Sequence, residues 1–363
     1  MRQRVNSAIA RWLIHAAVLS AAWCCGGLPP SSAAALTPND FYYPTYQGYL
    51  DLIGAPAAWE ISTGSPSVIV AVLDSGVNAA APDLAGRVLP GISTTTGPVL
   101  DGITISHGTQ VASVVAMDIN NGIGGAGIGR FTILPITVTN TMGSNTSYWL
   151  ADGVRRAAAE GAKAIVISQS TLTYSPVNQA AAEVADRALV FVAAGNSNSR
   201  RSEAALPNYE HLIFVSGTMG DDRAVWTGGG SSWGPAVDLS APAVSVLVAD
   251  PTVLPNGYGL NSGTSFAAPI AAGAAALVWS INPNLTPAQV KQILFSTATD
   301  LGDPGWDEVF GHGRVNLAGA AAAAVATVPE PAAMLSLAML AAIGAFRKTF
   351  RLSNRFARLR TRR

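Results

Sequence analysis

Short apolar runs alternate with helix-like segments along most of the chain. The runs are rich in β-branched residues and have the length of strands. They are continuously apolar, which is typical of parallel strands buried on both faces. The predicted strands cover residues 68–73, 131–138, 164–167 and 189–193.

Helical patterns follow these runs. The predicted helices cover residues 111–117, 148–160, 176–188 and 267–279, and another begins near residue 286. Ser147 is the expected cap of the second helix, and Pro176 suits the first turn of the third. Thr286 and Gln289 form a capping box around Pro287. Alternating strands and helices predict a doubly wound, mainly parallel α/β sheet with helices on both faces, whose sites gather at the carboxyl ends of strands.

Length and composition bound the size of the core and the charge of the folded part of the chain. With 363 residues and 49% hydrophobic content, the chain can bury a large core as one or two domains. The net charge is zero only because charge is segregated: residues 36–328 hold 11 basic and 21 acidic residues, a net of −10. An acidic body argues against a nucleic-acid partner, because phosphate binding needs a basic face.

Residues 1–35 have the layout of a secretory signal peptide. Three arginines precede a mostly apolar stretch at 12–25, and Ala33–Ala35 supplies a small-residue cleavage site. Both cysteines, Cys24 and Cys25, lie in this segment, so no disulfide is expected in the exported body. The alternative is a buried N-terminal helix.

Residues 329–363 form a second predicted targeting segment. Pro329-Glu330-Pro331 precedes an apolar run at 332–346 and an Arg-rich tail, and residues 321–328 before it look like an Ala-rich linker. The run is shorter than the roughly 20 residues that span a bilayer. This layout resembles the PEP-CTERM sorting signal, which implies cleavage by an exosortase-type membrane protease, a transient inner-membrane tether, and release to the cell surface or outside. A simple tail anchor and an amphipathic helix are the alternatives.

A serine stands where a glycine-rich turn meets a small-residue helix pattern. Ser265, in residues 263–269, would lie at the positive end of a helix dipole, which favours an oxyanion beside it. Asp74 ends a buried strand, where an unpaired carboxylate would cost several kcal/mol. Of the three histidines in the body, His107 suits a partner best, because a helix opens directly after it. Serine, histidine and aspartate are the groups that nucleophilic acyl transfer requires.

These three motifs, in the order Asp, His, Ser, resemble those of the subtilisin-like serine peptidases over residues 36–320. Residues 36–40 and 53–59 are similar to the start of a mature thermitase-type enzyme. The resemblance implies that Asp74 orients, His107 is the general base and acid, and Ser265 is the nucleophile of peptide-bond hydrolysis through an acyl-enzyme. Asn196 and the Ser265 backbone N–H would then donate to the oxyanion.

The resemblance also implies a cleft for a peptide or protein substrate in a monomeric enzyme. The substrate-binding residues would be Gly143, Ser144, Ser170, Thr171, Leu172, Ala194 and Gly195. Leu172, where the family commonly has glycine, would crowd the primary specificity pocket, and little room is left before residue 36 for an inhibitory pro-domain. These departures motivate an alternative: a catalytically weak or inactive binding protein of the surface or matrix.

Residues 119–125 resemble the calcium loop of the same family. A glycine-rich loop can turn several carbonyls inward, and calcium prefers six to eight oxygen ligands. The ligands implied by the resemblance are Asp40, Asp83, Ile119, Asn121, Ile123 and Gly125. A solvated turn with unrelated acids is the alternative.

Two further patterns are weaker. Residues 122–127 read as G-x-G-x-x-G but follow a helix, which argues against a dinucleotide site. Residues 230–234 match the G-x-S-x-G elbow of lipases and esterases, with Ser232 as the nucleophile, but no apolar strand leads into them. An esterase is therefore a third hypothesis.

Overall fold

The computed structural model describes residues 36–328 except 170–172, 203–208 and 254–256. The predicted signal peptide and sorting signal lie outside the described residues. So do Ser170, Thr171 and Leu172, three of the predicted substrate-binding residues.

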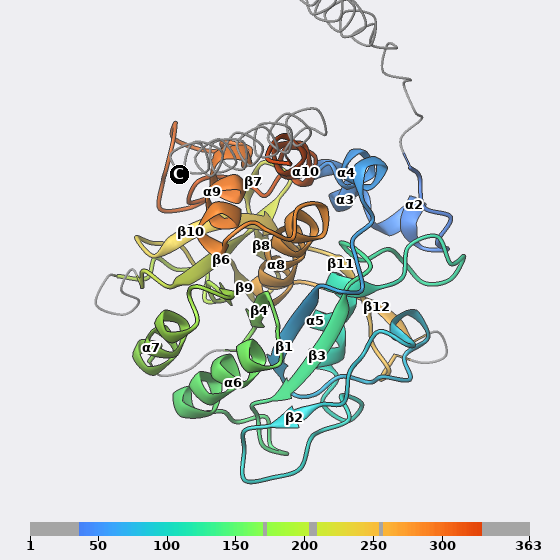
Figure 1. Ribbon diagram of the computed structural model, residues 1–363, viewed down its shortest axis with the longest axis vertical. Helices are drawn as coiled ribbons and strands as arrows, with labels where there is room; N and C mark the ends of the chain where they lie inside the picture. The colour runs from blue at the N-terminus through green and yellow to red at the C-terminus, as the bar shows by residue number, and fades with distance from the viewer. Residues whose placement is uncertain (1–35, 170–172, 203–208, 254–256, 329–363) are drawn as a thin grey trace, which may run out of the picture. The chain divides into compact units, whose positions relative to one another are not determined.

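A mainly parallel sheet forms the centre of residues 36–328 (Figure 1). Its strand order is β10-β6-β5-β4-β1-β3-β2, all pairs of which are parallel, and β7 pairs antiparallel with β6. The strands are β1 (Ile69–Asp74), β2 (Ile92–Ser93), β3 (Thr132–Thr137), β4 (Ala164–Ile167), β5 (Leu189–Ala193), β6 (Leu212–Met219), β7 (Asp222–Arg223) and β10 (Val237–Pro242). This arrangement confirms the predicted fold class, and β4 and β5 have the predicted bounds.

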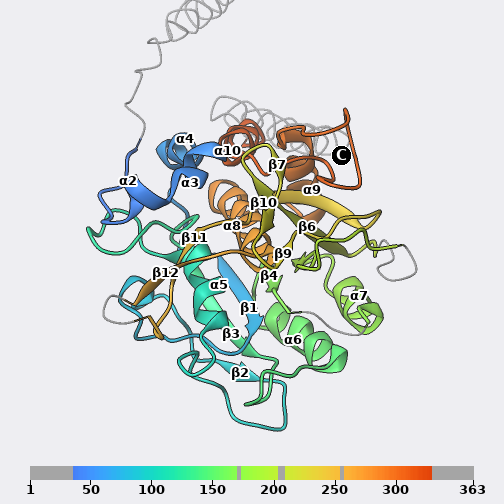
Figure 2. The same ribbon diagram turned by 180° about the vertical axis from the view of Figure 1, so that it is seen from behind.

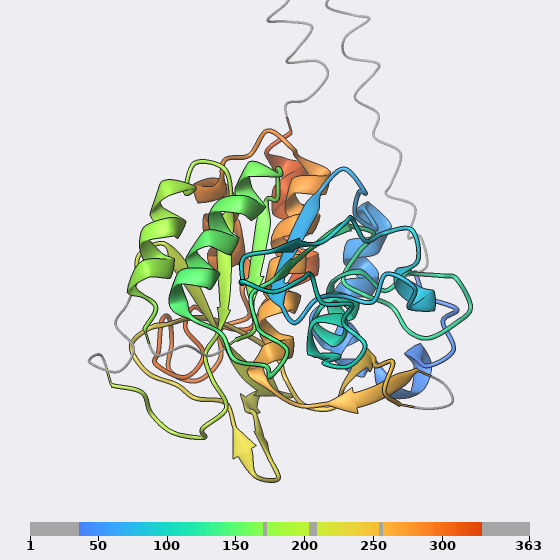
Figure 3. The same ribbon diagram turned by 90° about the horizontal axis from the view of Figure 1, so that it is seen from below.

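Helices cover both faces of this sheet. On one face lie α5 (His107–Ala116) and α8 (Thr264–Ile281), and α8 packs across β4, β5, β6 and β10. On the other lie α6 (Ser147–Ala159) and α7 (Ser175–Glu183), which pack against each other. Figure 2 shows the sheet from behind, and Figure 3 shows the two helix layers with strands between them.

The continuous apolar runs are explained by these two layers. In β1, Val70 and Val72 belong to the core cluster under α5 and α8, whereas Ala71 and Leu73 belong to the cluster under α6 and α7. Because side chains alternate along a strand, a strand buried on both faces needs apolar residues at every position. The run ends at Asp74, the point where the sheet stops and a site begins.

Smaller elements complete the described fold. Three short helices precede the sheet, the 3-10 helix η1 follows β1, two hairpins form separate two-stranded sheets, and two helices follow α8. They are α2 (Tyr43–Tyr46), α3 (Gly48–Leu52), α4 (Ala55–Ile61), η1 (Pro82–Leu84), β8 (Val225–Trp226), β9 (Gly229–Gly230), β11 (Val246–Ala249), β12 (Tyr258–Asn261), α9 (Pro287–Thr297) and α10 (Leu317–Ala326).

Three predicted helix ends meet different outcomes. The capping box of α9 is confirmed, with reciprocal bonds between Thr286 and Gln289. The cap of α6 is Thr146, whose hydroxyl accepts the N–H of Trp149, so Ser147 is the first helical residue instead. The helix after Pro176 ends at Glu183, earlier than predicted, because the chain turns there to enter β5.

The Ala-rich segment before the tail is not a linker. Residues 317–326 form α10, which packs against α4 and α8, and Ala320, Ala321 and Ala324 are buried in the core. Alanine permits close helix packing because its side chain is a single methyl group. The segment therefore completes the core, and the correction moves the end of the folded domain to about residue 326.

Helix α8 is long and apolar enough to cross a membrane by length and composition. In this fold 89% of the tested window is buried inside the protein, as expected for the central helix of a core. Its close packing is visible at Gly273, where an added Cβ would lie 2.7 Å from the Cβ of Ile128.

We expect Gly273→Val to lower the free energy of unfolding by about 1–3 kcal/mol, because the added atoms overpack a filled core. Gly48→Val is the matched control: a Cβ there meets nothing within 4 Å, so the change should stay within about 0.5 kcal/mol. Urea unfolding of both variants measures the difference. Equal stability of the two variants would show that α8 can move away from Ile128 at no cost.

Candidate active site

The predicted acid and base meet at the carboxyl end of β1. The Nδ1 atom of His107 lies 2.9 and 3.0 Å from the two carboxylate oxygens of Asp74. The Asp74 side chain is buried, whereas the His107 side chain is 32% exposed. The imidazole therefore has one edge held by a buried charge and another edge accessible from outside.

Local backbone geometry brings α5 this close to β1. A Cβ at Gly108 would collide with the carbonyl of Gly76, so only glycine permits the approach. The hydroxyl of Ser75 accepts the N–H of Gly108 at 3.1 Å and donates to the carbonyl of Ile105 at 2.7 Å. These contacts fasten the first turn of α5 to the end of β1.

The charges of the pair shift both pKa values. Burial by itself would raise the pKa of Asp74, but attraction to His107 and hydrogen bonds, one from the Ser75 N–H at 2.7 Å, hold it below its ordinary value. Burial by itself would lower the pKa of His107, but the charge of Asp74 and its hydrogen bond hold it above 6.5. A raised pKa makes the ring a stronger base near neutral pH.

The predicted nucleophile lies in the first turn of α8. Ser265 is the second residue of that helix and is 9% exposed. Its backbone N–H is one of the donors that a first turn leaves without a helical partner. The carbonyl of Ser265 also lacks its usual partner, because Pro269, four residues on, has no N–H. The hydroxyl of Ser168, just after β4, donates to that carbonyl instead at 2.8 Å.

The Ser265 hydroxyl and the His107 ring share one neighbourhood without a direct bond. The Ser265 hydroxyl donates to the carbonyl of Ser168 at 3.4 Å. The His107 ring lies 6.2 Å, centroid to centroid, from Phe266, the next residue of α8. Within the described part of the chain no hydrogen bond joins His107 to Ser265. Catalytic hydrogen bonds are often loose before substrate binds.

Asn196 is held by the same helix start. Its side-chain oxygen accepts the N–H of Thr264 at 2.9 Å and the hydroxyl of Thr264 at 2.8 Å. Its side-chain nitrogen donates to none of the described residues. The amide is therefore fixed by one end with its N–H groups free, next to the residue that precedes Ser265.

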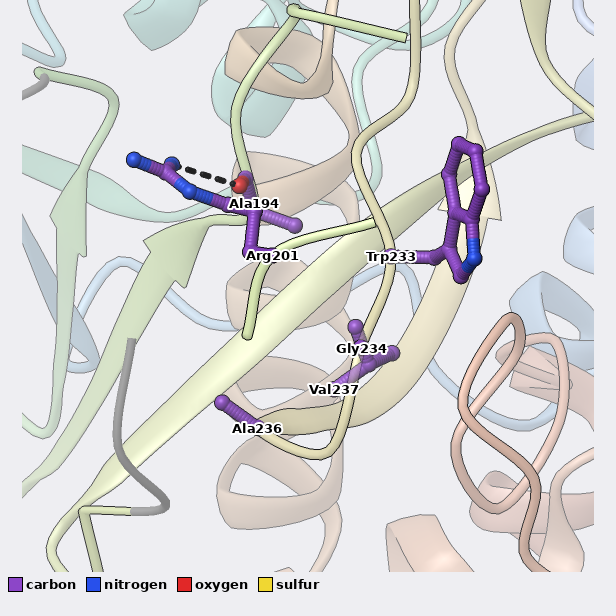
Figure 4. Close-up of a pocket in the computed structure, with 6 residues that line it drawn as sticks. All are labelled: Ala194, Arg201, Trp233, Gly234, Ala236 and Val237. Carbon is purple, nitrogen blue, oxygen red and sulfur yellow. Dashed lines mark hydrogen bonds between the residues drawn. The ribbon is translucent and has the colours of Figure 1, made fainter. Parts of the chain in front are cut away.

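Two pockets flank these residues. Figure 4 shows the first, beside the end of β5, where the guanidinium of Arg201 donates to the carbonyl of Ala194 at 3.2 Å. It is closely packed and leaves no room for a water molecule. The second has a volume of about 270 Å³ and lies between the loop before His107 and the loop after β3. Its lining residues are Val99, Leu100, Asp101, Thr104, Ile105 and Thr141.

The predicted substrate-binding residues of the loop after β3 are accessible. Gly143 and Ser144 are both exposed and follow closely on Thr141 of the larger pocket. Asn140 shapes this loop, since its side-chain oxygen accepts the N–H groups of Met142 and Ser144. Gly195 follows Ala194 at the other side of the site, and its N–H donates to the Thr264 hydroxyl at 3.1 Å.

The predicted calcium loop faces two buried carboxylates. Asp40 accepts the N–H groups of Asn120 and Asn121, and Asp83 accepts the Asn121 side-chain amide and the Gly125 N–H. Both acids are 1% exposed, and no basic side chain pairs with either one in the described part of the chain. Burial raises the pKa of Asp83 to about 6, and the charge of Asp40 adds to that rise.

This donor set fits a hard cation, with one exception. Two buried, unpaired carboxylates beside a carbonyl-rich loop suit calcium, which binds oxygen ligands. The carbonyl of Ile119, however, accepts the guanidinium of Arg130 at 2.6 Å. A carbonyl already paired with a cation is a poor calcium ligand, so the predicted role of Ile119 does not fit this structure.

One polar contact of the site is not evident from the sequence pattern. Gln169 directly follows Ser168, and its side-chain nitrogen lies 3.4 Å from Nδ1 of His107. In the sequence, Gln169 carries no motif that marks it as part of a site. Only the tertiary fold, which places the end of β4 beside the end of β1, shows the contact.

The two weaker motifs do not form sites. Ser232 is fully buried after β9, no helix follows it, and its hydroxyl accepts the N–H of Ser197 at 3.2 Å, so it lacks the geometry of a nucleophile elbow. Residues 122–127 follow α5 and belong to the loop at Asp40 and Asp83.

Known proteins are similar to this chain in sequence and in fold. The profile of the subtilase family matches residues 65–313. A thermophilic serine proteinase from Bacillus sp. (strain AK1) is 33% identical over 285 residues, covering 78% of this chain and 69% of that protein. Thermitase from Thermoactinomyces vulgaris is 32% identical over 283 residues, covering 77% and 97% of the two chains. Subtilisin from Bacillus pumilus is 35% identical over 280 residues, covering 74% and 96%.

Solved structures agree. A protease from Pseudoalteromonas arctica superposes with a TM-score of 0.69 at 27% identity, covering 80% of this chain and 100% of its own. A lanthipeptide protease superposes with a TM-score of 0.66 at 26% identity, covering 80% and 99%. The chain belongs to the subtilase family, and it is a serine-type endopeptidase.

Proposed function

We propose that this protein is an exported endopeptidase that hydrolyses peptide bonds through an acyl-enzyme on Ser265. The observation that carries the proposal is the position of the His107 ring, which contacts the buried Asp74 carboxylate and lies 6.2 Å, centroid to centroid, from Phe266 in the first turn of α8. The substrate is a peptide or protein chain. Its backbone would lie along the exposed loop at Gly143 and Ser144, with a side chain in the 270 Å³ pocket.

The proposed reaction uses the groups described above. His107 Nε2 takes the proton of the Ser265 hydroxyl as Oγ attacks the substrate carbonyl carbon. The carbonyl oxygen becomes an oxyanion, to which the Asn196 side chain and the Ser265 N–H donate. His107 then gives its proton to the departing amine as the C–N bond breaks. Water, deprotonated by the same ring, hydrolyses the ester and restores Ser265. Asp74 stabilises the imidazolium throughout.

A non-enzymatic binding protein is the competing proposal. Leu172 and the little room for a pro-domain before residue 36 motivate it, and Leu172 lies outside the described residues. The paired Asp74 and His107 weigh against it, because a binding protein has no need to hold a partly exposed imidazole on a buried charge.

We expect Ser265→Ala to abolish labelling by a fluorophosphonate probe and to lower peptide turnover about a million-fold, the size of loss known for a subtilisin without its nucleophile. Asn196→Ala should lower turnover by about 10²–10³-fold, the loss that a subtilisin shows without this donor. Casein and peptide-library hydrolysis measure both.

Ser280→Ala, at the far end of α8, is the control and should keep full labelling. Ser232→Ala should also keep it, and its inactivity would instead favour the esterase hypothesis. A folded wild-type protein that neither takes the probe nor cleaves any peptide would favour the binding protein.

We propose in addition that calcium stabilises the fold. Asp40, Asp83, the Asn121 amide and the carbonyls of Ile123 and Gly125 would hold it. A bound cation would supply the positive charge that the two buried carboxylates lack among the described side chains. The ion would have a structural role, because the hydrogen bonds of Asp40 and Asp83 involve the loop at 120–125 and none of the proposed catalytic residues.

The melting temperature in EGTA should therefore be lower, by roughly 5 °C, than the melting temperature in saturating calcium. Calorimetry with EGTA and with added calcium measures the change. Asp83→Asn should reduce the response, whereas Asp222→Asn, at an exposed position in β7, should leave it intact. An unchanged melting temperature in EGTA would remove calcium from the proposal.

We propose finally that residues 1–35 direct export, and that residues 329–363 act as a PEP-CTERM-type signal after the subtilase domain of 36–326. The Pro329-Glu330-Pro331 motif, the short apolar run and the basic tail support this. An exosortase-type protease would be the processing partner, and the protein would reach the cell surface or the medium as a monomer.

In a Gram-negative host with an exosortase, the exported protein should end near Pro329. Intact-mass measurement checks the end point. Glu330→Ala should retain the tail, and Glu160→Ala, at an exposed position after α6, should be processed normally. A mature protein that still ends at Arg363 would contradict the sorting signal.

A further inference from the structure

One dipeptide contacts the whole proposed catalytic group. Ser168 and Gln169 follow β4, which is paired with β1. Ser168 exchanges two hydrogen bonds with Ser265, one through its hydroxyl and one through its carbonyl. The side chain of Gln169 reaches in the other direction, to His107 and Asp74. Ser168 thus holds the nucleophile, while the role of Gln169 is unassigned.

The orientation of the Gln169 amide follows from the donors around it. The proton on Nδ1 of His107 is held by Asp74, whose oxygens lie 2.9 and 3.0 Å away. Nδ1 therefore has no lone pair for Gln169, although the two nitrogens are 3.4 Å apart. An amide oxygen pointing at the carboxylate would be repelled. The amide N–H must face Asp74, a carboxylate that can accept up to four hydrogen bonds.

We propose that Gln169 is a positioning residue, whose amide N–H donates to the Asp74 carboxylate and limits the basicity of His107. The proposal rests on the proposed function, because it assigns Gln169 a part in the same reaction. Three donors then surround one carboxylate: the Ser75 N–H, the His107 ring and the Gln169 amide.

The backbone of Gln169 is fixed well enough for this role. Its carbonyl accepts the hydroxyl of Tyr174 at 3.0 Å. Tyr174 is 6% exposed and packs edge-on against Phe214, with ring centroids 5.4 Å apart and an interplanar angle of 89°. A residue anchored by a buried aromatic ring has few conformations to lose when its side chain makes a directed contact.

The sign of the effect follows from the same geometry. The positive end of the amide dipole lies beside the ring, so it opposes the charge on the imidazolium. Asp74 is the one charged group that acts on the pKa of His107 in the described part of the chain, and Phe266 supplies an uncharged neighbour. Without Gln169 the carboxylate would attract the imidazolium more strongly, and the pKa of His107 would rise.

The test is the pH dependence of kcat/KM in the exported enzyme. Wild-type activity should rise with pH through the pKa of His107. Gln169→Leu has nearly the same volume but no N–H, so its acid limb should move upward by roughly 0.5 pH units. Gln169→Met should shift likewise and serves if the leucine variant folds poorly. A purely structural role would lower kcat/KM at every pH and leave the limb in place.

A second measurement needs no activity. The imidazole of His107 can be titrated by NMR in the Ser265→Ala background, with and without Gln169→Leu. An upward shift there supports the contact even if peptide hydrolysis were absent, so failure of the proposed function and failure of this inference are distinguishable. Gln179→Leu, at an exposed position of α7, is the matched control and should leave the titration unchanged.

Two results would overturn the proposal. A limb and a titration that stay in place in both Gln169 variants would show that the amide does not act on the pair. A downward shift would show the reverse orientation, in which the amide oxygen accepts from His107. Tyr174→Phe, which frees the Gln169 carbonyl, should shift the limb in the same upward direction by a smaller amount.

Discussion

The site depends on one buried carboxylate. Asp74 ends β1 inside the protein, where a lone charge would be too costly to keep. The His107 ring and the Ser75 N–H satisfy it, and each is held in place by other contacts. Ser75 also fastens the first turn of α5, and Gly108 lets that turn approach. The cost of burying Asp74 is thus offset by contacts that set the position of the imidazole.

A second constraint positions the nucleophile. Pro269 cannot donate to the carbonyl of Ser265, and a buried carbonyl without a partner is unfavourable. The hydroxyl of Ser168, at the end of β4, donates to this carbonyl instead. The helix start is thereby tied to the sheet beside β1. Asn196 is attached to the same turn through Thr264, so its free N–H groups lie near the Ser265 backbone. The missing helical bond thus ties the end of β4 to the start of α8, and the N–H and hydroxyl of Thr264 tie Asn196 to the same turn.

Buried charge is also the main feature of the loop at residues 119–125. Asp40 and Asp83 are buried without a basic partner among the described residues, and the raised pKa of Asp83 is the cost of that arrangement. The two sites use the same principle in different ways. At Asp74 the titratable ring of His107 stabilises the carboxylate, and the exposed edge of the ring remains available for chemistry. At Asp83 only hydrogen bonds from Asn121, Gly125 and Tyr258 stabilise the charge.

The local sequence pattern by itself indicated several strands and helices of this protein and its class of chemistry. Apolar runs indicated β4 and β5 with correct bounds, Thr286 and Gln289 indicated a helix start, and the residues around Asp74, His107 and Ser265 indicated a peptidase. Tertiary structure decided what pattern cannot encode. The Ala-rich stretch became α10 because its methyl groups fit between α4 and α8. The Ile119 carbonyl was taken by Arg130. The Gln169 side chain lies next to His107 because strand pairing places β4 beside β1. Such contacts join residues far apart in the chain, so their energies are invisible until the sheet brings them together.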